Sequence, residues 1–104
     1  MSQSHITFFE RFEADILSSK KTITIRDESE KDYAPNSTVQ VSTYERGRWF
    51  CALKIQSVNA INFSELSDFH AKQENMTLSE LKNVIQEIYP NIEKLYVISY
   101  ELLE

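Results

Sequence analysis

The segment that most constrains the fold is residues 20–27, a short alternating stretch that follows an amphipathic helical pattern. Ile23 and Ile25 share one face of a strand here, because strand side chains point alternately to opposite faces of a sheet. The other face carries hydroxyl groups and a fixed cation, from Thr22, Thr24 and Arg26. Lys20 and Lys21 stand directly before the strand. A strand with one apolar face and one polar face buries only its apolar face in the core. We therefore expect the remaining chain to form a scaffold around this strand and to place a carboxylate beside its polar face.

The chain is expected to form a single domain over residues 1–104, because this length suffices for one core. Hydrophobic residues make up 41% and charged residues 26%, which is typical of a globular protein. The sequence contains no run of the roughly 18 apolar residues that a membrane span needs, and its start lacks the pattern of a secretory signal. Its one cysteine, Cys51, excludes an internal disulfide and fits a reducing compartment. We therefore predict a cytoplasmic protein with no membrane partner.

Charge and ligand residues limit the classes of function. The net charge of −5 disfavours a large footprint on a phosphate backbone, which requires clustered lysines and arginines. Two histidines and one cysteine cannot build a Cys/His zinc site, and the carboxylates show no ligand spacing. A carboxylate-rich metal site stays possible from the residues alone, and no cofactor is expected.

Helical periodicity predicts three helices. The first should run over residues 8–17, with Thr7 as N-cap and Glu10 completing a capping box. A second should start at Ser64 with Phe69 on its apolar side, and it should break at residues 73–75. A third should follow the capping box of Thr77 with Glu80 and stop before the proline at position 90.

Strand patterns cover residues 22–26, 38–44, 49–58 and 95–102, and Gly47 marks a hairpin between the second and third of them. In the third, Trp49 and Cys51 share an apolar face, on which the cysteine acts as a small hydrophobe. Grouped strands without βαβ alternation predict an α+β protein. We expect a small, partly closed mixed β-barrel flanked by about three helices.

Two stretches of the sequence together resemble a known family. The first comprises Ile6-Thr7-Phe8-Phe9, Arg11-Phe12, Asp15-Ile16-Leu17 and the segment from Lys21 to Glu28. The second comprises His70-Ala71, the segment from Gln73 to Leu78, Glu80-Leu81-Lys82, Val84-Ile85 and Ile88-Tyr89-Pro90. Both resemble the small bacterial N4-acetylcytidine amidohydrolases, which are single-domain ASCH members of the PUA-like barrels. Ser19 departs from the wider ASCH pattern, in which a glycine often precedes the lysine. The sequence therefore does not determine the conformation of the turn before Lys21.

The resemblance implies metal-free hydrolysis of the acetyl amide on N4 of cytidine, a small nucleoside substrate, to give cytidine and acetate. By matching positions it implies that Lys21 is the general base, Thr24 the nucleophile and Glu74 the general acid. Chemically, the lysine requires a pKa lowered toward neutrality, by burial or by neighbouring cations such as Lys20 and Arg26. Arg26 could also donate to the oxyanion or to the cytosine carbonyl. Glu74 requires a drier site that keeps its proton.

One geometric conflict arises from strict alternation, which places Lys21 on the face opposite Thr24. We therefore predict that Lys20 and Lys21 belong to a turn and that the strand begins at Thr22. Tyr33, Tyr44, Trp49 and Phe50 are candidates for stacking on the base, although barrel packing explains them as well.

Two alternatives remain open. In one, the domain binds RNA or a nucleotide without hydrolysis, as PUA-like barrels often do. In the other, Glu74 activates water, Lys21 polarises the acetyl carbonyl and Thr24 only positions the substrate. We favour a monomer.

Overall fold

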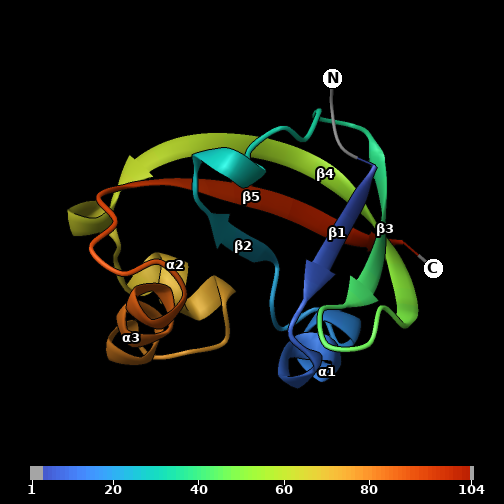
Figure 1. Ribbon diagram of the computed structural model, residues 1–104, viewed down its shortest axis with the longest axis horizontal. Helices are drawn as coiled ribbons and strands as arrows, with labels where there is room; N and C mark the ends of the chain where they lie inside the picture. The colour runs from blue at the N-terminus through green and yellow to red at the C-terminus, as the bar shows by residue number, and fades with distance from the viewer. Residues whose placement is uncertain (1–3, 104) are drawn as a thin grey trace.

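The computed structural model describes residues 4–103, which form one curved sheet with short helices at its two ends (Figure 1). The strands are β1 (His5–Phe8), β2 (Ile23–Arg26), β3 (Thr38–Thr43), β4 (Trp49–Asn62) and β5 (Lys94–Leu103). The helices are α1 (Glu13–Leu17), α2 (Asp68–Gln73) and α3 (Leu78–Ile88). Three 3₁₀ turns accompany them, η1 (Glu10–Phe12), η2 (Glu28–Glu30) and η3 (Phe63–Glu65). None of the helices in residues 4–103 is long and apolar enough to cross a membrane.

The strand order in the sheet is β1-β3-β4-β5-β2. The pair β1–β3 is parallel and the other three pairs are antiparallel, so the sheet is mixed. The long β4–β5 ladder arches across the molecule, with α2 and α3 at one end and α1 at the other (Figure 1). The α+β class is confirmed, but the predicted barrel is wrong, because β1 and β2 are the edges of an open sheet.

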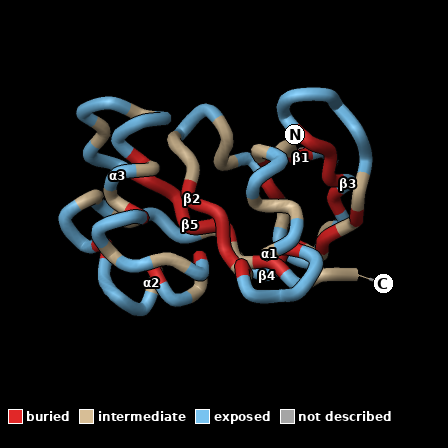
Figure 2. Tube along the Cα trace, turned by 90° about the horizontal axis from the view of Figure 1, so that it is seen from below, coloured by how far each residue is buried: buried red, intermediate tan, exposed pale blue. Residues whose placement is uncertain are grey.

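The buried apolar residues form two clusters that share β5. Figure 2 shows how the buried residues are distributed along the chain. Ile98 and Tyr100 belong to the cluster that lies on β1, β3, β4 and α1. Leu95 and Val97 belong to the cluster that packs against β2, α2 and α3. This alternation along β5 follows from the two-residue period of a strand. The two clusters therefore lie on opposite faces of the sheet along β5.

Several elements lie where their local patterns predicted them. The α3 helix begins after a capping box in which the Glu80 N–H donates to Thr77 Oγ1 at 3.1 Å and the Thr77 N–H donates to Glu80 Oε1 at 3.0 Å. Gly47 occupies the hairpin with a φ of +67°. The strands β2 and β3 differ from their predicted ranges by one residue at one end and β5 by one residue at each end, whereas β4 continues to Asn62.

The N-terminal helix was predicted wrongly. Thr7 and Phe8 are not a helix start but pair with Ser42 and Thr43 as part of β1. The helical region begins only at Glu10, first as the turn η1 and then as α1. Pairing with β3 in the folded chain outweighs the local capping signal, whose contribution is only about 1 kcal/mol.

Two aromatic residues also differ from their predicted places. Phe69 is 67% exposed, since α2 begins at Asp68 rather than Ser64. Trp49 is 58% exposed, although it was expected to share a buried face with Cys51. A bulge explains Trp49: Val41 pairs with Cys51, but Ser42 pairs with Trp49, so the residue between them is extra.

Candidate active site

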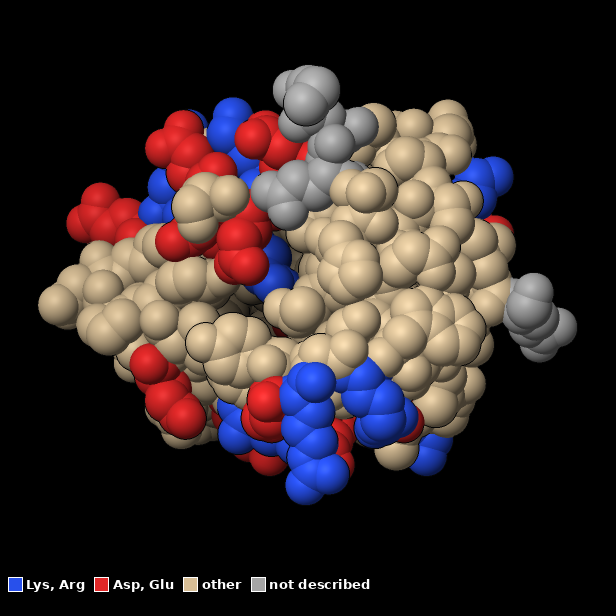
Figure 3. Space-filling view, turned by 45° about the vertical axis from the view of Figure 1, so that its right-hand side comes forward, with Lys and Arg blue, Asp and Glu red and all other residues tan. Residues whose placement is uncertain are grey.

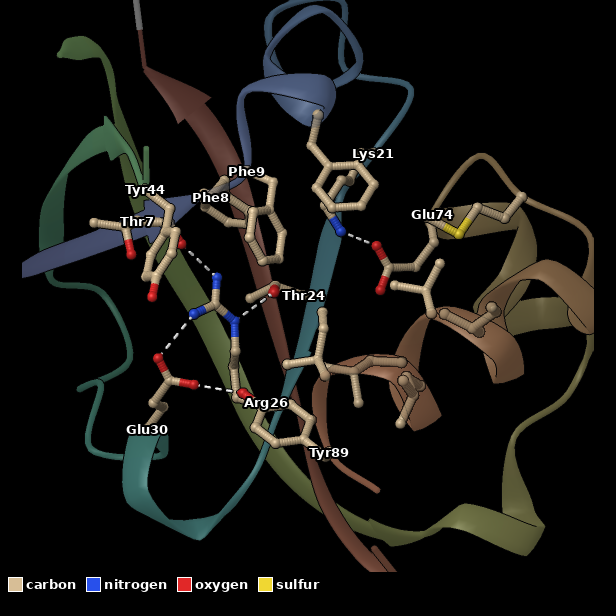
Figure 4. Close-up of a pocket in the computed structure, with 17 residues that line it drawn as sticks. Thr7, Phe8, Phe9, Lys21, Thr24, Arg26, Glu30, Tyr44, Glu74 and Tyr89 are labelled. Carbon is tan, nitrogen blue, oxygen red and sulfur yellow. Dashed lines mark hydrogen bonds and ion pairs between the residues drawn. The ribbon is translucent and has the colours of Figure 1, made fainter. Parts of the chain in front are cut away.

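A cavity of about 250 Å³ opens between the β1 and β2 edges and helix α3 (Figure 4). This is just below the roughly 300–1,000 Å³ of typical small-molecule sites, so it suits a base-sized group rather than a polymer. One wall is apolar and comes from the α3 region, with Met76, Leu81, Val84, Ile85 and Ile88. The opposite wall is aromatic and comes from Phe8, Phe9, Phe12 and Tyr44. The polar lining comes from Thr7, Lys21, Thr24, Arg26, Glu30, Glu74 and Tyr89.

The end of helix α1 positions Lys21. Ser19 adopts a φ of +60° and its N–H donates to the Ile16 carbonyl, while the Lys20 N–H donates to the Asp15 carbonyl at 2.9 Å. This is the Schellman arrangement, which favours glycine at the residue with positive φ. Ser19 therefore adopts the positive-φ turn conformation that the sequence alone did not determine. The Lys21 N–H also donates to the Asp15 carbonyl, so Lys21 lies before β2, as predicted, although the strand begins at Ile23 rather than Thr22.

The end of helix α2 positions Glu74 in the same way. Glu74 is the C-cap, Asn75 has a φ of +57°, and the Met76 N–H donates to the Ala71 carbonyl at 2.9 Å. The two helix ends are joined, because the Thr22 N–H donates to the Gln73 carbonyl at 2.8 Å. Two helix C-termini thus bring a lysine and a glutamate together from segments that are 53 positions apart in the sequence, at residues 21 and 74.

Lys21 and Glu74 form a direct ion pair inside the protein, with 3% and 4% of their surfaces exposed. Lys21 Nζ also donates to the Ile23 carbonyl at 2.9 Å, and it lies 5.1 Å from the ring centre of Phe12. In this dry setting, burial lowers the pKa of Lys21 well below its ordinary value, and the Arg26 guanidinium lowers it further, while Asp15 raises it. Burial disfavours the charged ammonium, so the neutral amine of Lys21 becomes accessible.

Thr24 points into the same cavity, from the middle of β2 (Figure 4). Its Oγ1 accepts a hydrogen bond from Arg26 Nε at 2.9 Å. Among residues 4–103 no hydrogen bond joins Thr24 to Lys21, so the hydroxyl proton of Thr24 remains available to a group in the cavity. Because Lys21 precedes the pleated part of the strand, its amine reaches the side on which Thr24 lies.

Arg26 joins the two edges of the open sheet. Its Nη2 donates to the Thr7 carbonyl of β1 at 2.7 Å, and its Nη1 donates to Glu30 Oε1 at 3.0 Å. The guanidinium carbon lies 5.0 Å from the ring centre of Phe8. Side-chain contacts of Arg26 therefore link β1 to β2 where no backbone ladder does.

The structure brings Lys21, Thr24, Glu74 and Arg26 around one cavity. Lys20 is exposed and does not line it. Of the stacking candidates only Tyr44 lines the cavity; the other three, Tyr33, Trp49 and Phe50, do not.

Sequence reasoning missed Glu30 and Tyr89. The four-residue spacing from Arg26 to Glu30 was a usable signal, but the charged segment around Glu30 suggested a solvated loop.

The charges of the cavity are paired. Lys21 contacts Glu74, and Arg26 contacts Glu30. The space-filling view shows acidic side chains gathered above a hollow in the molecular surface, with a group of mixed charge below it (Figure 3). Within residues 4–103 no group of three or more histidine, cysteine, aspartate or glutamate residues could hold a metal ion.

The profile of the family described as ASCH domain matches residues 3–101. The chain belongs to the ASCH domain family. A Vibrio vulnificus protein named N(4)-acetylcytidine amidohydrolase is 73% identical over 96 residues, which cover 92% of each chain. A Shewanella protein of the same name is 54% identical over 103 residues, which cover 99% of this chain and 100% of the relative. These relatives confirm the resemblance that the two sequence stretches indicated.

A solved structure agrees on the fold. The ASCH domain from Lactobacillus crispatus has a TM-score of 0.77 to this chain, covering 97% of this chain and 80% of that one. Its 14% identity makes it evidence for the shared ASCH fold alone.

Proposed function

We propose that this protein hydrolyses the N4-acetyl amide of N4-acetylcytidine to give cytidine and acetate. The observation that carries the proposal is the buried Lys21–Glu74 pair beside the Thr24 hydroxyl in one cavity. The chain is also 73% and 54% identical to proteins named for this activity. The activity is that of a hydrolase acting on an amide C–N bond.

In the proposed acylation step, the neutral Lys21 amine takes the hydroxyl proton of Thr24, and Thr24 Oγ1 attacks the acetyl carbonyl carbon. Protonated Glu74 gives its proton to N4 as the C–N bond breaks and cytidine leaves. The products are acetyl-Thr24, a Lys21 ammonium and a Glu74 carboxylate, so every proton is accounted for. The lowered pKa of Lys21 supports its role as base, because an ordinary lysine is almost entirely protonated at neutral pH.

In the proposed deacylation step, the Glu74 carboxylate takes a proton from water, which attacks the acetyl ester. The Lys21 ammonium returns a proton to Thr24 Oγ1, and acetic acid leaves. The pair then holds the same protons as at the start. The direct contact of the two side chains suits this exchange of roles.

Arg26 is the proposed partner of the developing negative charge. Its Nε donates to Thr24 Oγ1, which stabilises the threonine oxygen as it loses its proton. The cytosine amine is a better leaving group than an alkylamine, because its lone pair is delocalised into the ring. A metal is therefore not required to expel it.

Water attack with Glu74 as general base remains a second mechanism. It uses the same three side chains, and it differs in predicting no acetyl group on Thr24. RNA binding is less well supported, since Lys21 and Arg26 are both paired with carboxylates, which leaves neither cation of the lining for a phosphate. A monomeric state and a cytoplasmic location stay predictions.

The test is release of cytidine from N4-acetylcytidine by pure protein in the presence of a chelator. We expect turnover by the parent, and loss of about a hundredfold or more in Thr24→Val and Lys21→Met. Thr22→Val and Lys20→Met are the matched controls, because both residues lie in the same segment but neither lines the cavity. A folded parent without turnover would refute the proposed substrate.

Mass spectrometry of the intact protein after rapid acid quenching separates the two mechanisms. An acetyl group on Thr24 supports covalent catalysis. Full turnover by Thr24→Val excludes it.

A further inference from the structure

Arg26 is held by a chain of contacts that reaches helix α3. Glu30 receives Arg26 Nη1 on Oε1 and the Tyr89 hydroxyl on Oε2, the latter at 2.5 Å. Glu30 ends the turn η2, and Tyr89 is the C-cap of α3. One carboxylate therefore connects two donors that lie 63 positions apart in the sequence, at residues 26 and 89. Figure 4 shows the three side chains together at one end of the cavity, with Glu30 contacting both Arg26 and Tyr89.

The orientation of the Arg26 guanidinium determines whether Thr24 Oγ1 receives a hydrogen bond from Nε. A guanidinium is planar and its N–H groups have fixed directions, so Nε points at Thr24 only while the plane of the group is held. Three acceptors fix that plane, namely Thr24 Oγ1, the Thr7 carbonyl and Glu30 Oε1. The carbonyl belongs to the sheet backbone, whereas Glu30 is a half-exposed side chain that needs its own support.

Tyr89 supplies that support. Burial, and then the hydrogen bond to Glu30, raise the pKa of Tyr89, so the hydroxyl remains a donor throughout the physiological pH range. Tyr89 also ends the helix whose apolar face forms one wall of the cavity. The hydrogen bond from Tyr89 therefore ties Glu30 to this wall of the cavity.

We propose that Glu30 and Tyr89 are positioning residues that act through Arg26 to orient the Thr24 hydroxyl for attack. The assignment rests on the proposed function, and it deepens that function by adding two residues that do not touch the reacting atoms. The competing explanation is structural: the same contacts would only fasten η2 and α3 to the sheet edge.

The experiment compares kcat and KM for N4-acetylcytidine in Tyr89→Phe and Glu30→Gln with those of the parent. Tyr89→Phe removes a single oxygen, and Glu30→Gln removes the charge but keeps the shape. We expect kcat to fall about tenfold or more in each, with KM within about threefold, because the lost interaction acts on the nucleophile rather than on binding. Tyr96→Phe and Glu28→Gln, whose side chains lie outside the cavity lining, should keep kcat within about twofold.

A double-mutant test separates positioning from fastening. Lysine cannot reproduce the fork of donors at position 26. If Tyr89 acts through Arg26, adding Tyr89→Phe to Arg26→Lys should lower kcat by less than about twofold further. An unchanged kcat in both single variants, or a full additional loss in the Arg26→Lys background, overturns the assignment.

The outcomes also distinguish this inference from the proposed function. Turnover by the parent with unaffected Tyr89→Phe and Glu30→Gln refutes only the positioning roles. Absence of turnover by the folded parent refutes the proposed function and the positioning roles with it. If Glu30→Gln does not fold, Tyr89→Phe decides alone.

Discussion

Replacing Lys21 alone by methionine should destabilise the fold far more than replacing both Lys21 and its ion-pair partner Glu74. Methionine has a similar length and no charge, so Lys21→Met leaves the Glu74 carboxylate buried with its partner gone. Breaking a buried ion pair from one side costs about 3–5 kcal/mol, because the remaining charge is desolvated and uncompensated. Domains of this size are stable by only about 5–15 kcal/mol, so the effect is large.

The double variant Lys21→Met, Glu74→Met provides the decisive comparison. Replacing both charges by apolar groups of similar volume is often neutral or stabilising by about 1–4 kcal/mol. We therefore expect the double variant to recover the stability of the parent while having no activity. Such a result would mean that the pair is kept for chemistry at a cost in stability.

Urea unfolding followed by circular dichroism measures these free energies, and thermal unfolding gives an independent value. A loss of 3–5 kcal/mol should lower the midpoint temperature by more than about 12 °C for a domain of this length. The loss should be smaller at pH 5 than at pH 8, because an unpaired buried carboxyl is tolerated only when protonated. If Lys21→Met is as stable as the parent, the pair is not buried as described and the reasoning fails.

Three further predictions concern activity, reactivity and backbone strain. Because the pKa of Lys21 is lowered and the neutral amine is the proposed base, kcat/KM should rise with pH well below about pH 10.4. It should fall again at higher pH, because the proposed mechanism also needs the proton that Glu74 donates; a pH–rate profile that rises only near about pH 10.4 would contradict the role of Lys21. Burial raises the pKa of the Cys51 thiol to about 11, so a thiol reagent at pH 8 should label unfolded protein rapidly and native protein hardly at all. Ser19→Val should lower stability by about 1–2 kcal/mol in urea unfolding, since a β-branched residue is strained at positive φ, whereas Ser19→Gly should not destabilise by that amount; equal stabilities would count against the Schellman turn.

The sequence determined the local elements whose signals are strong in themselves. The Thr77–Glu80 capping box and the apolar stripe after it placed α3, and alternation placed β2, β3 and β5 within one residue of their observed ends. These patterns succeeded because they depend on neighbours within a few residues. The prediction failed where a distant strand competed: Thr7 resembles an N-cap, yet it pairs with Ser42 in β1.

The candidate site depended on the tertiary structure to a much greater degree. The resemblance named Lys21, Thr24 and Glu74, whereas alternation alone placed Lys21 and Thr24 on opposite faces. The turn after α1 resolves this conflict, because it keeps Lys21 outside the pleated strand.

The positions of the other side chains of the site depend on contacts between distant parts of the chain. Glu74 meets Lys21 only because the ends of α1 and α2 are joined, and Tyr89 meets Glu30 only because α3 packs beside the β2 edge. The curvature of the open sheet also brings β1 close enough for Arg26 to reach the Thr7 carbonyl. Such contacts depend on packing between segments far apart in the sequence. No local pattern encodes them, and only the tertiary structure placed these groups around one cavity.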